Sequence, residues 1–353
     1  MSNFPLAYKL SWLPRLLKPS LAGDRRGFLP PEAVLLSRQP TPAKRLIFLG
    51  DISAVANRQA PEFDARLKEV IASAHLVIGN CESPVVEKIR RPLGTAAGTR
   101  HAMTPRFLAE TIDAAGIAPS RLLLSLANNH MLDQDEDGYA ETRHALARLG
   151  IATIGGAEDG LLGTIDIGGL TVAFAAFTEW RNTGRHAFAG RVTMLDDLTQ
   201  RDFAALRTAK ADLVCVVAHW DREFRHIPQP ATRKLAQRLV EAGAGLIVGH
   251  HAHVLQPAER IGQTLTAYGL GDLLGTALPR IPWPARLGAI LVVEISTDPK
   301  TRGRITGYRF VPFLRQRAGR RERLVPLEAA TGSVSNKARR RFAAIFPGAI
   351  EPS

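Results

Sequence analysis

The stretch AGLIVGHHAH, residues 244–253, joins an apolar run to three histidines within four positions. A short apolar run bounded by glycine is typical of a buried β-strand. The histidines that follow, His250, His251 and His253, can form a metal site, an acid–base site or a hydrophilic loop. In an extended segment residues two apart face the same way, so the pattern predicts that His251 and His253 are a pair of metal ligands.

Strand and helix patterns alternate on the N-terminal side of this stretch. Apolar runs of strand type are separated by segments with apolar residues three and four positions apart, which is typical of amphipathic helices. We predict strands at 45–50, 75–80, 121–129, 151–156, 163–180, 212–220 and 244–253, and helices at 61–74, 104–116, 138–150, 196–211 and 231–243. Pro61 is expected at the first position of its helix, and Gly168-Gly169 predicts a hairpin turn.

Strand patterns then follow one another without helices between them, at 254–271, 287–296 and 302–314, before a predicted terminal helix at 336–346. A βα alternation that leads into a strand-rich half predicts an α/β fold with two packed sheets and helices outside. Residues 1–44 are expected to be an irregular basic lead-in and residues 316–353 a basic C-terminal extension. Within the lead-in, Leu6, Leu10, Leu13 and Leu16 predict a short amphipathic surface helix that Pro14 interrupts.

The positive charge of the chain is concentrated at its ends. The 353 residues carry a formal net charge of +13, yet residues 46–299 contain 25 basic and 28 acidic side chains. The two ends together carry +16, so they account for the whole excess. This distribution argues against specific nucleic-acid binding by the central region, and it favours an ordinary solvated surface or attraction to a polyanion or a membrane face.

The cysteine content and the hydropathy predict where the protein acts. The two cysteines, Cys81 and Cys215, lie far apart in sequence, which favours free thiols in a reducing compartment. No run approaches the 18 or so apolar residues of a membrane span, and the N-terminus lacks the apolar core of a signal peptide. We therefore expect a cytoplasmic protein without a membrane span, with peripheral contact to the inner membrane as an alternative.

Polar groups that can bind metals follow each of the buried strands. In an α/β sheet the carboxyl ends of adjacent strands meet at one edge, where ligands bind. One such group alone is more typical of a turn or a helix cap. Five of them at successive strand ends predict a shared metal centre: Gly50-Asp51, Asn80-Cys81-Glu82, Asn128-Asn129-His130, His219-Trp220-Asp221 and His250-His251-Ala252-His253.

The side-chain types in these clusters limit which metals the site can bind. Carboxylates, imidazoles and an asparagine carbonyl suit Mn, Fe or Zn in a hydrolytic site, whereas a structural zinc site is rich in cysteine. The one candidate thiol is Cys81. It adjoins Glu82 in an extended segment, so we expect it to point away from Glu82 and to be structural.

Six motifs in order resemble a known family. The segments FLGD, GNCESP, LANNH, AHWDREF, GHHAHVLQP and AYGLGDLL resemble the bacterial capsule-synthesis CapA family, also called the poly-γ-glutamate biosynthesis family. That family is similar to the calcineurin-like metallophosphoesterases. The resemblance runs from about Arg45 to Leu274, and it implies a sandwich of two mixed β-sheets flanked by helices in a domain placed here at 45–315.

The resemblance also implies roles for individual residues. The positions that match metal ligands are Asp51, Glu82, Asn129, His219, His251 and His253. His130 matches the histidine that assists the leaving group or stabilises the oxyanion, and either His250 or His251 can be the first ligand of the final motif. We expect the neighbouring polar residues to orient these ligands or to contact substrate: Asn128, His250, Asp221, Glu223 and Asp272.

The chain departs from the family pattern at three positions. Many phosphoesterases begin with Asp-x-His, but here Ser53 stands where the histidine would be. Asp221 replaces the usual glycine after His-Trp, and Asp272 replaces the usual asparagine. The first change removes an imidazole ligand. The other two add carboxylates near the predicted pocket, which would alter the choice of metal or the substrate charge.

Three functional hypotheses follow. The first is a hydrolase in which two divalent ions are expected to activate a water molecule toward a phosphoester-type substrate, with His130 as acid and Arg222 and Glu223 on the pocket rim. The second is a metal-containing assembly or binding component for an anionic cell-surface polymer such as poly-γ-glutamate. The third is a polyanion-binding protein that acts through its basic ends. An anionic or polymeric substrate is expected in each case.

Overall fold

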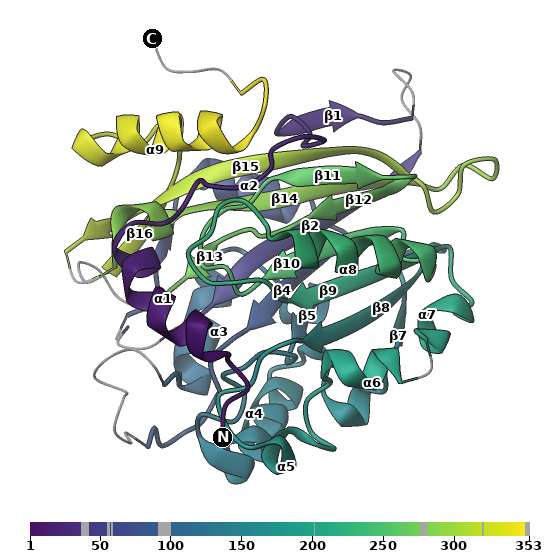
Figure 1. Cartoon of the computed structure of the whole chain (residues 1–353), viewed down its shortest axis with the longest axis horizontal. Coiled ribbons are helices and arrows are strands. Elements are labelled where there is room, and N and C mark those ends of the chain that lie inside the picture. The colour runs from purple at the N-terminus through teal and green to yellow at the C-terminus, as the bar shows by residue number, and fades with distance from the viewer. Residues whose placement is uncertain are drawn as a thin grey trace.

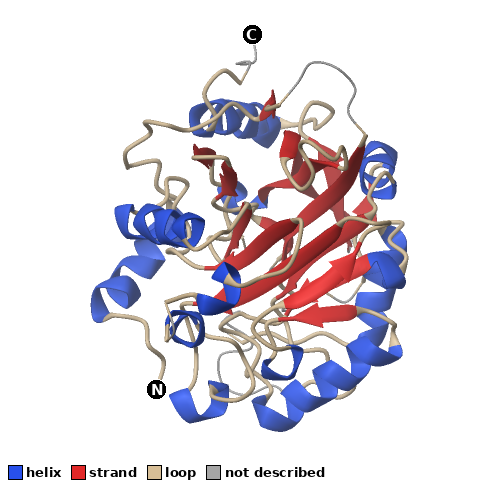
Figure 2. Ribbon diagram, turned by 90° about the vertical axis from the view of Figure 1, so that its right-hand side faces the viewer, coloured by secondary structure: helices blue, strands red, loops and turns tan. Residues whose placement is uncertain are grey.

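The computed structural model describes residues 1–36, 42–54, 57, 59–90, 100–200, 202–275, 281–319 and 321–349. These residues form two β-sheets packed face to face, with helices on their outer faces (Figures 1 and 2). Both sheets contain parallel and antiparallel pairs. The predicted α/β sandwich of two mixed sheets flanked by helices is therefore confirmed.

The described part of the larger sheet has ten strands in the order β3-β16-β15-β14-β2-β4-β5-β6, with β1 beside β15 and β13 beside β2. Strands β2, β4, β5 and β6 are parallel to one another. The strands are β1 (Glu32–Val34), β2 (Ala43–Ile52), β3 (Glu62–Phe63), β4 (Leu76–Cys81), β5 (Leu122–Ser125), β6 (Ala152–Ile154), β13 (Asp272–Leu274), β14 (Leu287–Ser296), β15 (Ile305–Ala318) and β16 (Arg321–Pro326).

The described part of the smaller sheet has six strands in the order β11-β12-β10-β9-β8-β7. Its four central strands are parallel, and β7 and β11 add antiparallel edges. The strands are β7 (Gly163–Asp166), β8 (Thr171–Thr178), β9 (Leu213–His219), β10 (Leu246–His250), β11 (Ala258–Ile261) and β12 (Thr264–Ala267).

Helices cover the outer faces of both sheets. Side chains of α2, α3 and α4 pack on the larger sheet, and side chains of α6, α7 and α8 pack on the smaller one. The helices are α1 (Leu6–Leu17), α2 (Ala65–Ala72), α3 (Pro105–Ala114), α4 (Asp135–Arg148), α5 (Arg185–Phe188), α6 (Leu195–Thr199), α7 (Ala204–Arg207), α8 (Pro230–Glu241) and α9 (Ser333–Ile345), with short 3-10 turns at Pro119–Arg121, Ala157–Asp159 and Trp283–Arg286.

Alternate residues of the central strands face different parts of the core. In β2, Leu46 and Phe48 face the space between the sheets, whereas Ile47 and Leu49 face the helices. This two-residue period is the expected geometry of a strand covered on both faces. It explains why the central strands contain continuous apolar runs, and it places Cys215 between the sheets, where it is a buried free thiol like Cys81.

Two predicted helices differ from the observed ones. The helix expected from Pro61 begins at Ala65, because the Asp64 side chain accepts a hydrogen bond from Arg66 N and caps the helix there. Glu62 and Phe63 instead form β3 beside β16. The helix expected at 196–211 is divided into α6 and α7, where Phe203 adopts a positive φ of 58°. The hairpin at Gly168-Gly169 is confirmed between β7 and β8.

The N-terminal segment is more ordered than an irregular lead-in. Helix α1 continues through Pro14 rather than ending there, and β1 pairs with β15. Leu6, Leu10 and Leu13 are exposed, while Leu16 is half-buried and packs against the protein. The predicted apolar row therefore faces outward, and another face of α1 contacts the rest of the molecule. Part of the predicted lead-in, residues 37–41, lies outside the described residues.

Among the described residues, none of the helices combines the length and the hydropathy that crossing a membrane requires.

Candidate metal centre

The carboxyl ends of strands from both sheets bring the predicted ligands together. Asp51 lies near the end of β2, Glu82 directly follows β4, and His219 ends β9. In the smaller sheet His250 pairs with His219 across β10 and β9. The predicted convergence of polar groups at one edge is observed, and their side chains are almost completely buried.

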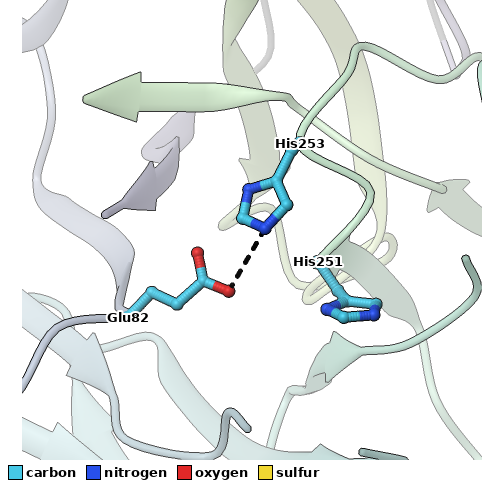
Figure 3. A group of neighbouring side chains, drawn as sticks. All are labelled: Glu82, His251 and His253. Carbon is cyan, nitrogen blue, oxygen red and sulfur yellow. Dashed lines mark ion pairs between the residues drawn. The ribbon is translucent and has the colours of Figure 1, made fainter. Parts of the chain in front are cut away.

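The two last histidines approach the centre in a way that the sequence did not indicate. Strand β10 ends at His250, so His251 and His253 do not lie in an extended segment. Both have positive φ, 84° and 52°. The expectation that they share a strand face is therefore wrong, because the chain turns here. The turn nevertheless places nitrogen atoms of both rings within 4.8 Å of each other and of a Glu82 oxygen (Figure 3).

Glu82 provides the test of whether a cation fits. Its side chain is fully buried, and neither carboxylate oxygen has a hydrogen-bond partner among the described residues. Nδ1 of His251 and Nε2 of His250 are also buried and also lack hydrogen-bond partners among the described residues. Buried polar atoms are seldom left without partners because desolvation is costly. Carboxylate and imidazole groups whose lone pairs are unused fit a divalent cation.

A second group of potential ligands shares one residue with the first. Ligand atoms of Asp51, His253 and Asp272 also lie within 4.8 Å of one another. His253 belongs to both groups, so the two groups adjoin each other. Asp272 thus lies closer to the centre than a rim residue would.

Asp51 is held by several donors. Its Oδ1 is 2.9 Å from Nδ1 of His250 and accepts a hydrogen bond of 2.8 Å from Asn80, while Oδ2 accepts one of 3.1 Å from the backbone N–H of His251. Burial by itself raises the pKa of Asp51, but His250, together with His253 and Asn80, outweighs burial and brings this pKa to about 2. Asp51 is therefore ionised, and His250 is placed to orient it.

His253 is clamped between carboxylates. Its Nδ1 lies 2.7 Å from Oδ1 of Asp272, whose Oδ2 accepts from Arg315 at 3.2 Å, and its Nε2 lies 3.7 Å from Glu82 Oε1. Burial alone would lower the pKa of His253, but Glu82 and Asp272 raise it well above the usual value. Burial also raises the pKa of Glu82. The neighbouring carboxylates of Glu82 and Asp272 thus favour a positive charge at the position of His253.

His219 and Asn129 meet across the two sheets. Nε2 of His219 lies 2.7 Å from Oδ1 of Asn129 and 3.5 Å from Glu82. Burial lowers the pKa of His219, and nearby His251 lowers it further, so the ring is neutral and suited to ligation. Asn80, which the sequence analysis placed in a cluster without giving it a role, donates to Asp51 and lies 3.3 Å from Nδ1 of His219.

His130 lies beside the centre with partners that the sequence analysis missed. Its Nδ1 is 2.6 Å from Asp133 Oδ2 and 3.1 Å from Asn182 Nδ2. The His101 ring stacks on it with a centroid distance of 3.5 Å and also contacts Ser53, Nδ1 to Oγ, at 3.1 Å. His101 thus places an imidazole against Ser53, the residue that stands where the Asp-x-His histidine would be. No local pattern marks His101, because its loop follows no predicted strand.

Three of the predicted neighbouring residues have structural roles. Asn128 bonds to Asn80 and to the backbone N–H of His130. The Asp221 carboxylate accepts hydrogen bonds from Gln256 and Gln229. Glu223 is buried under α1, where the Trp12 indole donates to its carboxylate, and it does not form an open rim with Arg222.

The sequence of the region that carries these residues matches a known family. Residues 45–277 match the bacterial capsule synthesis proteins called PGA_cap. The chain belongs to this family. The resemblance inferred from the six motifs is thereby confirmed, and Asp51, Glu82, His219 and His253 all lie inside the matched region of this PGA_cap protein.

Individual relatives agree with the family match. The chain is 28% identical over 234 residues to the capsule biosynthesis protein CapA of Bacillus anthracis, covering 63% of this chain and 56% of that protein. It is 26% identical over 241 residues to the PGA biosynthesis protein CapA of Bacillus subtilis strain 168, covering 64% and 62%. The chain thus spans less than two thirds of either relative. A putative 5′-nucleotidase from Staphylococcus aureus has a similar structure, with a TM-score of 0.45 and 14% identity, covering 85% of this chain and 58% of that one.

Proposed function

We propose that this PGA_cap protein is a metal-dependent hydrolase of the phosphoesterase type that acts on an anionic substrate during capsule or poly-γ-glutamate synthesis. The observation that carries the proposal is Glu82, whose two buried oxygens lack hydrogen-bond partners among the described residues and lie beside His219 and His253. The capsule names of the relatives support the biological setting.

The residues that would hold divalent cations are those at the edges of both sheets. We assign them as Asp51, Glu82, Asn129, His219, His251 and His253, with Asp272 orienting His253 and His250 orienting Asp51. Mn, Fe and Zn suit this donor set. When bound, such ions supply Lewis-acid activation of water and of the ester group.

His130 is the residue that we propose to move a proton. Its Nδ1 contacts Asp133, which fixes the ring and favours the proton on this nitrogen. Nε2 then remains to exchange a proton with a leaving group. General acid–base catalysis of this kind contributes about 10²- to 10⁴-fold to a rate. Asp133 and the stacked His101 ring hold the imidazole in place.

The test compares hydrolysis and metal content in the same protein samples. Wild-type protein with added Mn²⁺ should hydrolyse p-nitrophenyl phosphate or its diester. His130→Asn should reduce the rate by about 100-fold or more while keeping its metal, and Glu82→Gln should lose both. His144→Asn, on the exposed face of α4, is the matched control and should change neither. Equal rates in wild type and His130→Asn would refute the role of His130.

A specific observation favours the second candidate, a metal-containing assembly or binding component. Helix α1 covers one side of the centre, because its Tyr8 side chain is buried against His251 and its Trp12 covers the buried Glu223. A covered centre suits a structural metal better than rapid turnover. Wild-type protein that binds stoichiometric metal but hydrolyses neither phosphate monoesters nor diesters would support this function over the hydrolase.

A further inference from the structure

Helix α1 lies across the loops that carry the smaller sheet's side of the metal centre. Its N-terminal flank is tied to the loop after β8, where Asn3 donates to the carbonyl of Glu179 and accepts from the backbone N–H of Arg181. Further along, Arg15 Nε donates to the carbonyl of Glu223, at 2.9 Å, in the loop after β9. The helix therefore contacts both loops, which also bond to each other through Trp180 and Asp221.

One side chain of α1 reaches a residue that we assign as a metal ligand. Tyr8 is 2% exposed, and its hydroxyl oxygen lies 3.0 Å from Nε2 of His251. The same oxygen accepts a hydrogen bond of 3.1 Å from the backbone N–H of Glu223. Phe4 and Trp180 pack around both rings, with the Phe4 ring stacked on Trp180. Tyr8 is thus fixed in position on His251.

The partners of His251 decide which nitrogen can bind a cation. A neutral imidazole carries its proton on one nitrogen and a lone pair on the other. Nε2 contacts Tyr8, whereas Nδ1 is buried with no hydrogen-bond partner among the described residues. A proton on Nδ1 would occupy the nitrogen that has no hydrogen-bond partner among the described residues, and it would leave that nitrogen without a lone pair for a cation. With the proton on Nε2, donated to the Tyr8 oxygen, the Nδ1 lone pair is free for a metal.

We propose that Tyr8 is a positioning residue of the metal centre, whose oxygen accepts the Nε2 proton of His251 and so presents Nδ1 to a cation. This inference rests on the metal site of the proposed function. Tyr8 lies outside residues 45–277, so the family match does not contain it. Metal-binding histidines commonly donate their second ring N–H to an acceptor, and loss of that acceptor typically weakens metal binding 10- to 100-fold.

The experiment measures metal affinity by competition with a chelator in the full-length protein. Tyr8→Phe removes the oxygen and keeps the ring, so we expect metal binding to weaken by about 10-fold or more. Trp12→Phe is the matched control, because it removes one hydrogen bond from the same helix face, to the carboxylate of Glu223. We expect its metal affinity to equal that of the wild type. Thermal unfolding of each metal-free variant reports any general loss of stability.

A double-mutant cycle distinguishes positioning from general stabilisation. If Tyr8 acts through His251, then Tyr8→Phe should weaken metal binding in the wild type but not in a His251→Ala background. An equal loss in both backgrounds, or an unchanged affinity of Tyr8→Phe, would overturn the inference and leave the hydrolase proposal intact. Wild-type protein that binds no metal would overturn both.

Discussion

Gly249 shows how a single residue keeps the ligand-bearing strand in place. A Cβ atom added there would lie 1.9 Å from the carbonyl oxygen of Tyr268 and 2.2 Å from Nε1 of Trp220. The same indole donates a 3.0 Å hydrogen bond to that carbonyl. The glycine before the histidine cluster is therefore required by packing, since the backbone of β10 passes against these two groups at the point where it ends in His250.

Gly249→Ala should destabilise the fold. The added methyl group must displace buried backbone and an indole ring, and overpacking of this kind costs about 1–3 kcal/mol, here with the loss of a buried hydrogen bond as well. Urea-induced unfolding measures the effect. Gly163→Ala is the control, because its Cβ would meet only Ile154 Cγ2 at an ordinary 3.5 Å. Similar unfolding midpoints for the two variants would show that β10 can shift without cost.

The residues that sequence could predict at the centre are those whose position depends on a strand end. Asp51 and His219 lie at the ends of buried strands and Glu82 directly follows one, so the arrangement of the sheets places all three at one edge. Tyr8 and His101 could not be predicted, because a helix and a loop far away in sequence place them by tertiary contacts. The residues next to Tyr8 and His101 in the sequence do not indicate such contacts.

At the scale of elements, strands were predicted better than helix boundaries. Strands covered on both faces are continuous apolar runs, and β4, β9 and β10 lie where those runs indicate. Helix starts depend on single capping contacts, which is why Asp64 moves the start of α2. The interruption between α6 and α7 depends on the left-handed backbone conformation of Phe203. This conformation is uncommon for residues with large side chains, so the sequence does not predict it.

The loop between β9 and α8 contains a histidine that should make the fold sensitive to acid. His226 is fully buried, and its Nδ1 donates to the carbonyl of Leu255 at 2.7 Å. Burial lowers the pKa of His226 to about 3, although the bond to Leu255 opposes this shift. The unfolded chain takes up a proton near pH 6.5 and the folded chain does not. The free energy of unfolding is therefore unaffected by His226 above about pH 6.5, and it decreases as the pH falls from there toward 3.

We expect the unfolding free energy of the wild type to fall with decreasing pH more steeply than that of His226→Asn. One proton difference corresponds to about 1.4 kcal/mol per pH unit between pH 6 and 4. Asparagine retains a donor for the Leu255 carbonyl and does not titrate. Urea unfolding at several pH values measures both slopes, with the exposed His144→Asn as control. If wild type and His226→Asn had parallel pH profiles, His226 would not be the source.

At the scale of the whole molecule, the proposed ligands come from both sheets. Asp51 and Glu82 lie at the ends of strands of the larger sheet, whereas His219 ends a strand of the smaller sheet and His253 lies in the turn after another. The sheets otherwise meet through the apolar core between them. A cation held by both sets would therefore join the two halves of the sandwich, and its binding energy would add to the stability of the whole fold.

Metal binding should accordingly raise the unfolding temperature of the entire chain. A ligand at 100 times its dissociation constant adds about 2.7 kcal/mol to the unfolding free energy. Mn²⁺ or Zn²⁺ should stabilise the wild type, and EDTA should reverse the effect, as followed by calorimetry. Glu82→Gln should lose this response, while Glu158→Gln, at a surface ion pair with Arg143, should retain it. An equal shift in both variants would mean that the ions bind elsewhere, because Glu82 lies among the proposed ligands of the two sheets and Glu158 does not.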